Sequence, residues 1–240
     1  MKREPEDIKK EIALFYQVAQ TVHSLEINEL LREIVQIAIE VTHGDSCLIY
    51  VLDPKKDELV LRASKASHPK LMQKIKMKLG EGITGWVAKE KQPVAISDQA
   101  HSDPRFKYFR SLPEDQFAAF LSVPILNKRG VVGVINVQHK DLHMHSETEI
   151  NLLAAIGKLV GGAVENALLI EETLELKEAL VLRKLIEKAK GILMQRKKIS
   201  EKEAYRLMQK QSMQSRKSLK ELAEAVILAE ELKLGDVNTK

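Results

Sequence analysis

The chain has 240 residues, of which 44% are hydrophobic and 30% are charged, so it can bury a core and is not expected to be disordered. No run of about 18 apolar residues occurs, and the first ten residues lack an apolar stretch, so we expect neither a membrane-spanning helix nor a secretory signal. The single cysteine, Cys47, excludes an internal disulfide bond and fits a reducing, cytoplasmic location. Its place in an apolar run predicts a buried structural thiol.

The net charge of +4 conceals a strong asymmetry along the chain. Residues 181–220 contain 13 Lys and Arg residues and 3 acidic residues, a net charge of +10, so the other 200 residues carry −6. A compact basic end is typical of a protein that binds a polyanion. A basic surface that only solubilises the chain would give the same count.

Two amphipathic helices are predicted at the start of the chain, over residues 6–24 and 29–42. In the first helix, apolar residues recur at spacings of four and three, as in a coiled coil. These residues are Ile8, Ile12, Phe15, Ala19 and Val22.

The hydrophobic period then changes, which indicates β-structure. A turn at residues 53–57 separates the first two apolar segments, and the turn Asn127-Lys128-Arg129-Gly130 separates the last two, so both pairs predict antiparallel hairpins. The predicted strands are 47–52, 58–63, 92–96, 120–126 and 131–138, and a short helix is predicted within residues 79–88.

A long helix is predicted from Ser146, where Ser146 and Glu149 form the S-x-x-E pattern of a capping box. No strong helix breaker follows until about Arg196. An apolar seam with a period near 3.5 runs along this helix, interrupted at Lys177, and it requires a partner helix from the N-terminal segment or from a second subunit. The seam residues are Ile156, Val160, Ala163, Ala167, Ile170, Leu174 and Val181.

Three helical pieces are predicted after residue 181, and two of them follow the capping boxes at Ser200 and Ser218. In the first piece, six apolar residues share one broad face, which predicts the core of a three-helix bundle. These are Leu182, Leu185, Ile186, Ala189, Leu193 and Met194. Gly191 would permit a close helix crossing, and Lys184, Lys188 and Lys190 would lie outside the core.

The middle of the chain resembles a GAF domain. The segments LGEGITGWVAKEKQPVAISDQAHSDPRF (79–106) and SVPILNKRGVVGVINVQH (122–139) carry the resemblance, which covers roughly residues 25–170. It implies an α+β fold with an antiparallel sheet flanked by helices. GAF domains bind cyclic nucleotides, bilins, haem, small metabolites or nothing, so any cofactor is unknown.

The C-terminal segment resembles an ANTAR domain, the RNA-binding module of bacterial transcription antitermination regulators. The segment AKGILMQRKKISEKEAYRLMQKQSMQSRKSLKELAEAVI (189–227) carries this resemblance. It implies binding to paired hairpin loops of a nascent transcript, which suits a homodimer with two bundles. The resulting domain prediction is an N-terminal helix (1–24), a GAF sensor domain (25–165), a connecting helix (166–181), an ANTAR domain (182–234) and a tail (235–240).

Seven residues of the predicted ANTAR domain are candidates for RNA contact: Lys190, Arg196, Tyr205, Lys210, Ser212, Arg216 and Lys217. The cations suit phosphates or base edges, and Tyr205 could stack on an unpaired base. Equally, the cations could only solubilise the bundle, Tyr205 could pack beside Met208, and Ser212 could end its helix.

Four residues are candidates for the rim of a ligand pocket in the GAF domain: Trp86, Asp98, Asp103 and Arg105. A turn, a salt bridge and core packing would explain them as well. His139, His143 and His145 cluster after the last strand, but without a recognised metal-ligand spacing we expect solvated loop histidines and no metal site.

No catalytic motif is present: the sequence has no Walker A motif, nucleophile elbow or metal-cage spacing. The letters Gly80-x-Gly82-x-x-Gly85 lack a surrounding strand–helix–strand unit and do not predict dinucleotide binding. We therefore expect a signal-responsive antitermination regulator rather than an enzyme. A DNA-binding regulator, or a signalling module that docks on an acidic protein, remain alternatives.

Overall fold

The computed structural model describes residues 26–65, 72–107 and 117–235, and the predicted helix over residues 6–24 lies outside these ranges. The chain divides into two compact units, Met1–Glu171 and Glu172–Lys240. Helix α4 (Glu147–Lys197) contributes residues to both units. Each unit is described by itself below.

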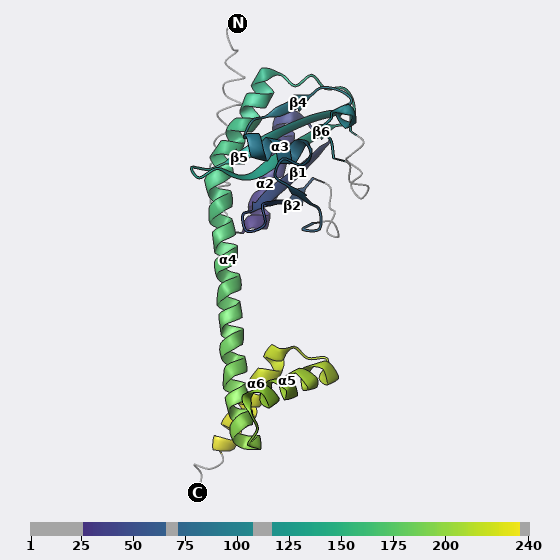
Figure 1. Cartoon of the computed structure of the whole chain (residues 1–240). Helices are drawn as coiled ribbons and strands as arrows, with labels where there is room; N and C mark the ends of the chain where they lie inside the picture. The colour runs from purple at the N-terminus through teal and green to yellow at the C-terminus, as the bar shows by residue number, and fades with distance from the viewer. Residues whose placement is uncertain (1–25, 66–71, 108–116, 236–240) are drawn as a thin grey trace. The chain divides into compact units, whose positions relative to one another are not determined.

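A six-stranded antiparallel sheet forms the centre of the first unit, with the strand order β3-β2-β1-β6-β5-β4 (Figure 1). All five predicted strands are confirmed, and the expected α+β class with a GAF-type antiparallel sheet is correct. Strand β3 was not predicted, because it has three residues and buries only Met77 between two lysines. The strands are β1 (Ser46–Asp53), β2 (Glu58–Ser64), β3 (Lys76–Lys78), β4 (Val94–Ile96), β5 (Ala119–Leu126) and β6 (Val131–His139).

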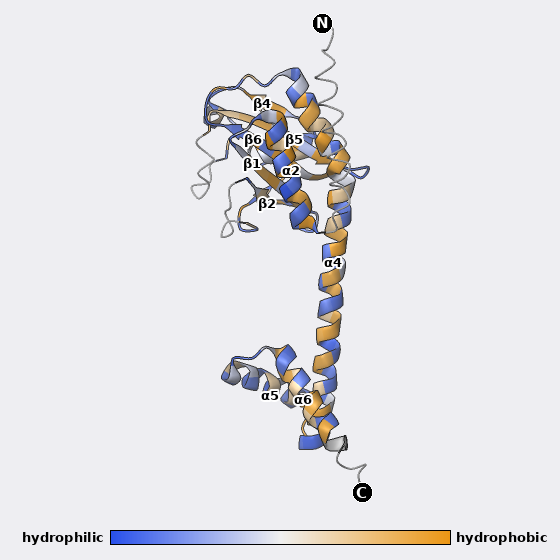
Figure 2. Ribbon diagram, turned by 180° about the vertical axis from the view of Figure 1, so that it is seen from behind, coloured by the Kyte–Doolittle hydropathy of each residue, from blue (hydrophilic) through white to orange (hydrophobic). Residues whose placement is uncertain are grey.

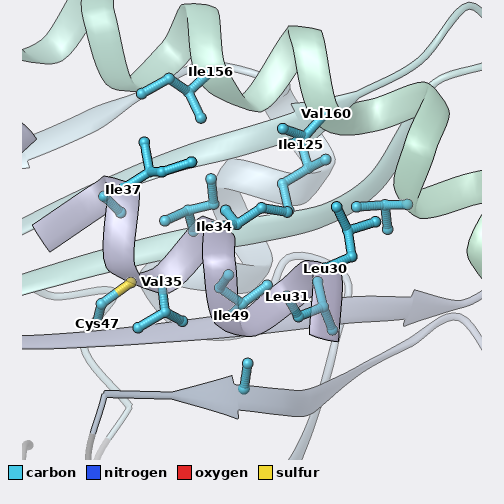
Figure 3. Close-up of a cluster of buried hydrophobic side chains, with 14 of the residues drawn as sticks. Leu30, Leu31, Ile34, Val35, Ile37, Cys47, Ile49, Ile125, Ile156 and Val160 are labelled. Atoms are coloured by element: carbon cyan, nitrogen blue, oxygen red, sulfur yellow. The ribbon is translucent and has the colours of Figure 1, made fainter. Parts of the chain in front are cut away.

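Helix α2 (Ile27–Thr42) and the first part of α4 cover one face of the sheet. Figure 3 shows Ile34 and Ile37 of α2 pointing toward Ile156 of α4 and Ile125 of β5. Cys47 belongs to the same cluster and is fully buried, which confirms the predicted structural thiol. Burial raises the pKa of this thiol well above its ordinary value, so it stays protonated and unreactive.

Two glycines allow α4 to approach strand β5 closely. A Cβ atom at Gly157 would lie 2.5 Å from the carbonyl oxygen of Pro124, and one at Gly161 would overlap the carbonyl oxygen of Leu126. A larger residue at either position would therefore push the helix away from the sheet.

Helix α3 (Gly82–Glu90) packs on the opposite face, over Leu48, Leu61 and Val134. Gly82, the first helical residue, has a φ of +68°, a conformation that favours glycine. The preceding residue, Glu81, accepts a 2.6 Å hydrogen bond from Lys107, which ties the start of α3 to the segment after the short 3₁₀ helix (Ala100–Ser102).

The second unit consists of the end of α4, α5 (Glu201–Ser215) and α6 (Leu219–Gly235), which share one small core. Both predicted capping boxes form: the amides of Glu203 and Glu221 bind the hydroxyl groups of Ser200 and Ser218, and both carboxylates bind the serine amides in return. The buried residues of this core are Ala189, Met208, Ala223 and Ile227.

The bundle core corrects two expectations. Gly191 has no atom within 4 Å of the position of a Cβ, so it does not mark a close helix crossing. Lys190 was expected outside the core, yet only 7% of it is exposed. Its charge is compensated by ion pairs with Glu187 and Glu201.

The predicted apolar seam of α4 divides into a covered part and an uncovered part. Ile156, Val160, Ala163 and Ala167 are buried in the core of the first unit. Among the described residues, nothing covers Leu174 or Val181, each of which is 54% exposed.

Helix α4 is long enough, and over one 18-residue window apolar enough, to cross a membrane. However, 44% of that window is buried inside the protein. The apolar residues that raise its hydropathy include Leu153, Ile156, Val160 and Val164, which are fully buried against the sheet. Core packing therefore accounts for the apolar character of this part of the helix.

The expectation of solvated loop histidines is wrong for two of the three residues. His139 is the last residue of β6 and is 6% exposed. The side chain of His145 is 1% exposed, whereas that of His143 is 32% exposed.

Candidate functional site

A small cavity lies between α3 and strands β1, β5 and β6 of the first unit. Its volume is about 30 Å³, which is roughly twice the minimum that a cavity needs to hold one water molecule. Leu48, Phe106 and Phe120 form apolar walls, and Thr84 and Asn136 supply polar groups. In this conformation the cavity admits a small polar group rather than a molecule as large as a nucleotide.

A buried hydrogen-bond chain lines the cavity. The hydroxyl of Ser122 donates to Oδ1 of Asn136 (2.7 Å), and Nδ2 of Asn136 donates to the hydroxyl of Thr84 (2.7 Å). Beside them, Oε1 of Gln138 is buried and has no hydrogen-bond partner among the residues that the structure describes. Because an unpaired buried acceptor costs free energy, this oxygen is suited to receive an N–H or O–H group from a ligand or a water molecule.

Sequence reasoning missed these polar residues, although a signal was present. In the apolar strand VVGVINVQ, Asn136 and Gln138 are two residues apart and therefore lie on the same face of the sheet. Polar residues at alternate positions of a buried strand indicate either a hydrogen-bond network or a ligand pocket.

The four predicted pocket residues do not line this cavity. Trp86, Asp103 and Arg105 come together instead: the guanidinium carbon of Arg105 lies 4.8 Å from the centre of the Trp86 ring. Arg105 also donates to both oxygens of Asp103, at 2.9 and 2.8 Å, and these bonds lower the pKa of Asp103. The carboxylate of Asp98 binds the amide of Gln99. Their predicted role in ligand binding stays a prediction.

Among the predicted RNA contacts, Lys190 and Arg196 are engaged in ion pairs. Nζ of Lys190 lies 2.8 Å from Glu187 and 2.6 Å from Glu201 of α5. The guanidinium group of Arg196 donates to both oxygens of Glu230 of α6, at 2.8 and 2.9 Å. These bonds connect α4 to α5 and to α6.

The other predicted contacts lie on or after α5 and are more accessible. Tyr205 is 38% exposed, and Lys210, Arg216 and Lys217 are exposed without a hydrogen bond or ion pair from their side chains in the described part of the chain. Ser212 does close a turn, because its hydroxyl donates to the carbonyl oxygen of Lys217 at 2.6 Å.

The structure adds two cations to this surface. Lys202, Arg206 and Lys210 are exposed and are spaced four residues apart, so they form a row along α5 opposite the buried Ala204 and Met208. The colours of Figure 2 show α5 as largely hydrophilic. Sequence reasoning missed Lys202 and Arg206, although the i, i+4, i+8 spacing could have identified them.

The GAF domain family model matches residues 24–165, which is more than half of the chain. The chain belongs to the GAF domain family. The ANTAR domain model matches residues 174–227, so an ANTAR domain follows the GAF domain. Both resemblances noted from the sequence are confirmed.

Curated relatives match mainly the GAF domain. A phosphoenolpyruvate-dependent phosphotransferase system protein of Escherichia coli is 27% identical over 130 residues, which are 54% of this chain and 17% of the relative. The Nif-specific regulatory protein of Herbaspirillum seropedicae is 24% identical over 164 residues, 65% of this chain and 30% of the relative. The chain thus spans less than a third of either relative.

Solved structures confirm the fold of the GAF domain. The GAF domain of the Acinetobacter phosphoenolpyruvate-protein phosphotransferase gives a TM-score of 0.59 at 24% identity, covering 72% of this chain and 99% of that one. The corresponding domain from Coxiella burnetii gives 0.60 at 24% identity, covering 65% and 94%.

The combination of domains establishes a broad function. GAF domains are sensory and ANTAR domains are RNA-binding regulatory modules, and neither family is catalytic. The protein is therefore a regulator under sensory control.

Proposed function

We propose that the protein is a transcription antitermination regulator whose ANTAR domain binds hairpin-loop RNA in nascent transcripts under the control of its GAF domain. The main support is the row of exposed cations on α5, Lys202, Arg206 and Lys210, in a domain of an RNA-binding regulatory family. Read-through of a terminator follows when the bound RNA is held in the antiterminated form.

The three cations on α5 span a length over which they can contact several phosphates. At a rise of 1.5 Å per residue, Lys202 and Lys210 are about 12 Å apart along the helix axis. Arg216 and Lys217, in the turn after α5, extend the positive surface beyond the end of the helix. Such cations bind phosphates by releasing counterions, which makes affinity depend on salt.

Two exposed side chains beside the row suit contact with bases. Tyr205 is 38% exposed and Met213 is 82% exposed. Bases of a hairpin loop are unpaired, and an aromatic ring provides a stacking surface that every base can use. The proposed interface therefore combines phosphate contacts from the cations with stacking on Tyr205.

Lys190 and Arg196 have a structural role in this proposal, not an RNA-binding role. Their charges are already compensated by Glu201 and Glu230, so using them for RNA would require breaking the bonds that hold α4 to the other helices. We assign them to positioning of the bundle and assign RNA contact to the accessible residues of α5 and the turn after it.

A homodimer would present two bundles to two hairpin loops. The uncovered part of the α4 seam, Leu174 and Val181, is the proposed contact with a second copy. Its spacing continues the repeat of about 3.5 residues that pairs helices in coiled coils. No other described segment covers these side chains.

The signal in this proposal is a small polar ligand at the GAF cavity. Oε1 of Gln138 provides a free acceptor, and Thr84 and Asn136 can reorient to pair with a ligand. The protein would act in the cytoplasm, where nascent transcripts occur. Whether ligand raises or lowers RNA affinity follows from which dimer arrangement the ligand favours.

The test is a competition experiment with the purified, tag-free full chain. Binding to a tandem-hairpin RNA is measured by fluorescence anisotropy from 50 to about 200 mM salt, with unlabelled duplex DNA or loop-substituted RNA as competitor. The proposal predicts that only RNA with intact loops competes efficiently. A preference for duplex DNA would establish a DNA-binding regulator instead, and no binding to either would favour docking on an acidic protein.

A further inference from the structure

Four side chains with metal-binding atoms converge at the junction between strand β6 and helix α4. His139 ends β6, His143 and His145 lie in the loop that follows, and Glu149 lies in the first turn of α4. One nitrogen of each imidazole and one carboxylate oxygen all lie within 4.8 Å of one another. The rings of His139 and His143 stack with their centres 3.8 Å apart.

Two nitrogens in this cluster have no partner. Nε2 of His139 and Nε2 of His145 are buried and make no hydrogen bond within the described part of the chain. Nε2 of His143 lies 3.0 Å from Oε1 of Glu149, and Nδ1 of His145 lies 3.5 Å from the same oxygen. A buried nitrogen without a partner is costly, and coordination of a cation would use its lone pair.

We propose that His139, His143, His145 and Glu149 bind one divalent transition-metal ion of the zinc class. The site is separate from the GAF cavity and from the RNA surface, so it is independent of the proposed function.

The chemistry of the ligands selects this class of ion. Imidazole nitrogens combined with a carboxylate suit Zn²⁺ and similar transition metals, whereas Ca²⁺ and Mg²⁺ take oxygen ligands. A histidine that binds a metal must do so as the neutral imidazole, through the lone pair of one ring nitrogen. Glu149 and Asp45 add negative charge beside the rings.

The geometry requires a modest contraction. Zinc bonds of about 2.0 to 2.1 Å place tetrahedral ligands roughly 3.3 Å apart, compared with the present spread of up to 4.8 Å. His143 and His145 can approach by side-chain rotation, because both belong to the loop between β6 and α4. The amide of His143 binds the carbonyl oxygen of Ser97, which already holds this loop near the cluster.

A bound metal would fix the start of α4 on the sheet. Glu149 also belongs to the capping box of α4, where its amide binds the hydroxyl of Ser146 at 3.1 Å. The metal would therefore cross-link the last residue of β6 to the first turn of the helix that continues into the ANTAR domain.

The experiment uses the tag-free full chain after treatment with a chelator. Zn²⁺ binding is measured by isothermal titration calorimetry, and the bound metal is counted after dialysis. The variants are His143→Ala and Glu149→Gln, and the control is His101→Ala, which removes an exposed histidine outside the cluster. Glu149→Gln keeps the capping box, since glutamine can replace glutamate in that motif.

We expect one Zn²⁺ per wild-type chain, a higher Tm with metal, and unchanged affinity in His101→Ala. Each cluster variant should lose at least about 100-fold in affinity, more than the loss of an outer-shell partner commonly causes. Circular dichroism verifies that both variants are folded. Absence of zinc binding to the wild type, or wild-type zinc affinity in folded Glu149→Gln and His143→Ala, would overturn the proposal.

Discussion

The two units of this protein are stabilised in different ways. Among its described residues, the GAF unit buries 22 core residues on one face of its sheet and 13 on the other. Among the described residues of the ANTAR unit, the buried apolar residues are Ala189, Ala204, Met208, Ala223 and Ile227. This unit supplements them with two capping boxes and with ion pairs that start from Lys188, Lys190 and Arg196. The GAF domain thus has a large hydrophobic core, whereas the ANTAR domain has a small one.

The difference extends to where each unit places its polar groups. In the GAF domain, Ser122, Asn136 and Thr84 are buried and hydrogen-bonded, as a small ligand pocket requires. In the ANTAR domain, most charged side chains are exposed, including Lys202, Arg206 and Lys210 of α5. A small core leaves more of each helix surface available for a large polyanion.

The largest loss of folding stability is expected for Met208→Ala, which truncates the largest fully buried side chain of the bundle. Loss of a buried Met costs about 2 to 5 kcal/mol, and a core of this size rarely supplies more than about 3 to 5 kcal/mol. Hydrogen exchange should show loss of protection in residues 189–227 and normal protection in the GAF sheet. Met213→Ala, at an 82% exposed position, is the control. Unchanged protection in Met208→Ala would refute the small-core account.

A smaller loss of folding stability is expected for Asn136→Ala in the GAF domain. The substitution leaves the hydroxyl groups of Ser122 and Thr84 without their partner, at a cost of about 1 to 3 kcal/mol. Chemical denaturation should show this loss in the GAF transition while RNA affinity stays at the wild-type value. Asn151→Ala, at an exposed position of α4, should change stability by less than about 0.5 kcal/mol. Equal effects of the two substitutions would contradict a structural role for the buried network.

Dimerisation should respond to Leu174→Glu. A charge in the uncovered seam should raise the dimer dissociation constant about tenfold, which corresponds to about 1.4 kcal/mol. Sedimentation equilibrium measures it. Leu176→Glu changes a residue that is 65% exposed on a different face of α4 and should have a weaker effect. A stronger effect of Leu176→Glu would place the contact on that other face.

The smallest effect concerns the Asp103–Arg105 pair. Hydrogen bonds from Arg105 lower the pKa of Asp103, so the pair stabilises the folded state above the unfolded-state pKa of about 3.9. This contribution is lost as the pH falls through the lower, folded-state pKa. Because the pair is partly exposed, it is worth at most about 1 kcal/mol. In Asp103→Asn, the free energy of unfolding, measured by chemical denaturation, should therefore decrease less between pH 6 and pH 3 than in the wild type. If the two proteins lose the same stability over this range, the pair does not contribute.

The periodic pattern of hydrophobic residues predicted the helices and strands well where the pattern was strong and depended on nearby residues. The strand pattern, the capping boxes at Ser146, Ser200 and Ser218, and the buried Cys47 follow from side-chain alternation and short-range hydrogen bonding. Strand β3 was missed because a three-residue strand has no period to detect. The domain boundaries at residues 165 and 181 stay a prediction.

The sites were less predictable because they depend on contacts between distant residues. A helical wheel places Lys190 off the apolar face, and only the positions of Glu187 and Glu201 show that its charge is compensated. Likewise, the spacing of His139, His143 and His145 did not indicate that Glu149 and the end of β6 would enclose them. The polar group of the GAF cavity could not be predicted either, because it depends on the pairing of Ser122 with Asn136 between two strands. The predicted strands do not specify that register.

The most direct test of the central claim is the salt dependence of RNA affinity in an Arg206→Ala, Lys210→Ala double variant. With two phosphate contacts removed, the slope of log affinity against log salt should fall by about 1.4 to 1.8 relative to the wild type. Lys128→Ala, an exposed lysine of the GAF domain, should leave the slope unchanged. If the double variant keeps the wild-type slope, α5 is not the RNA-binding surface and the account is wrong.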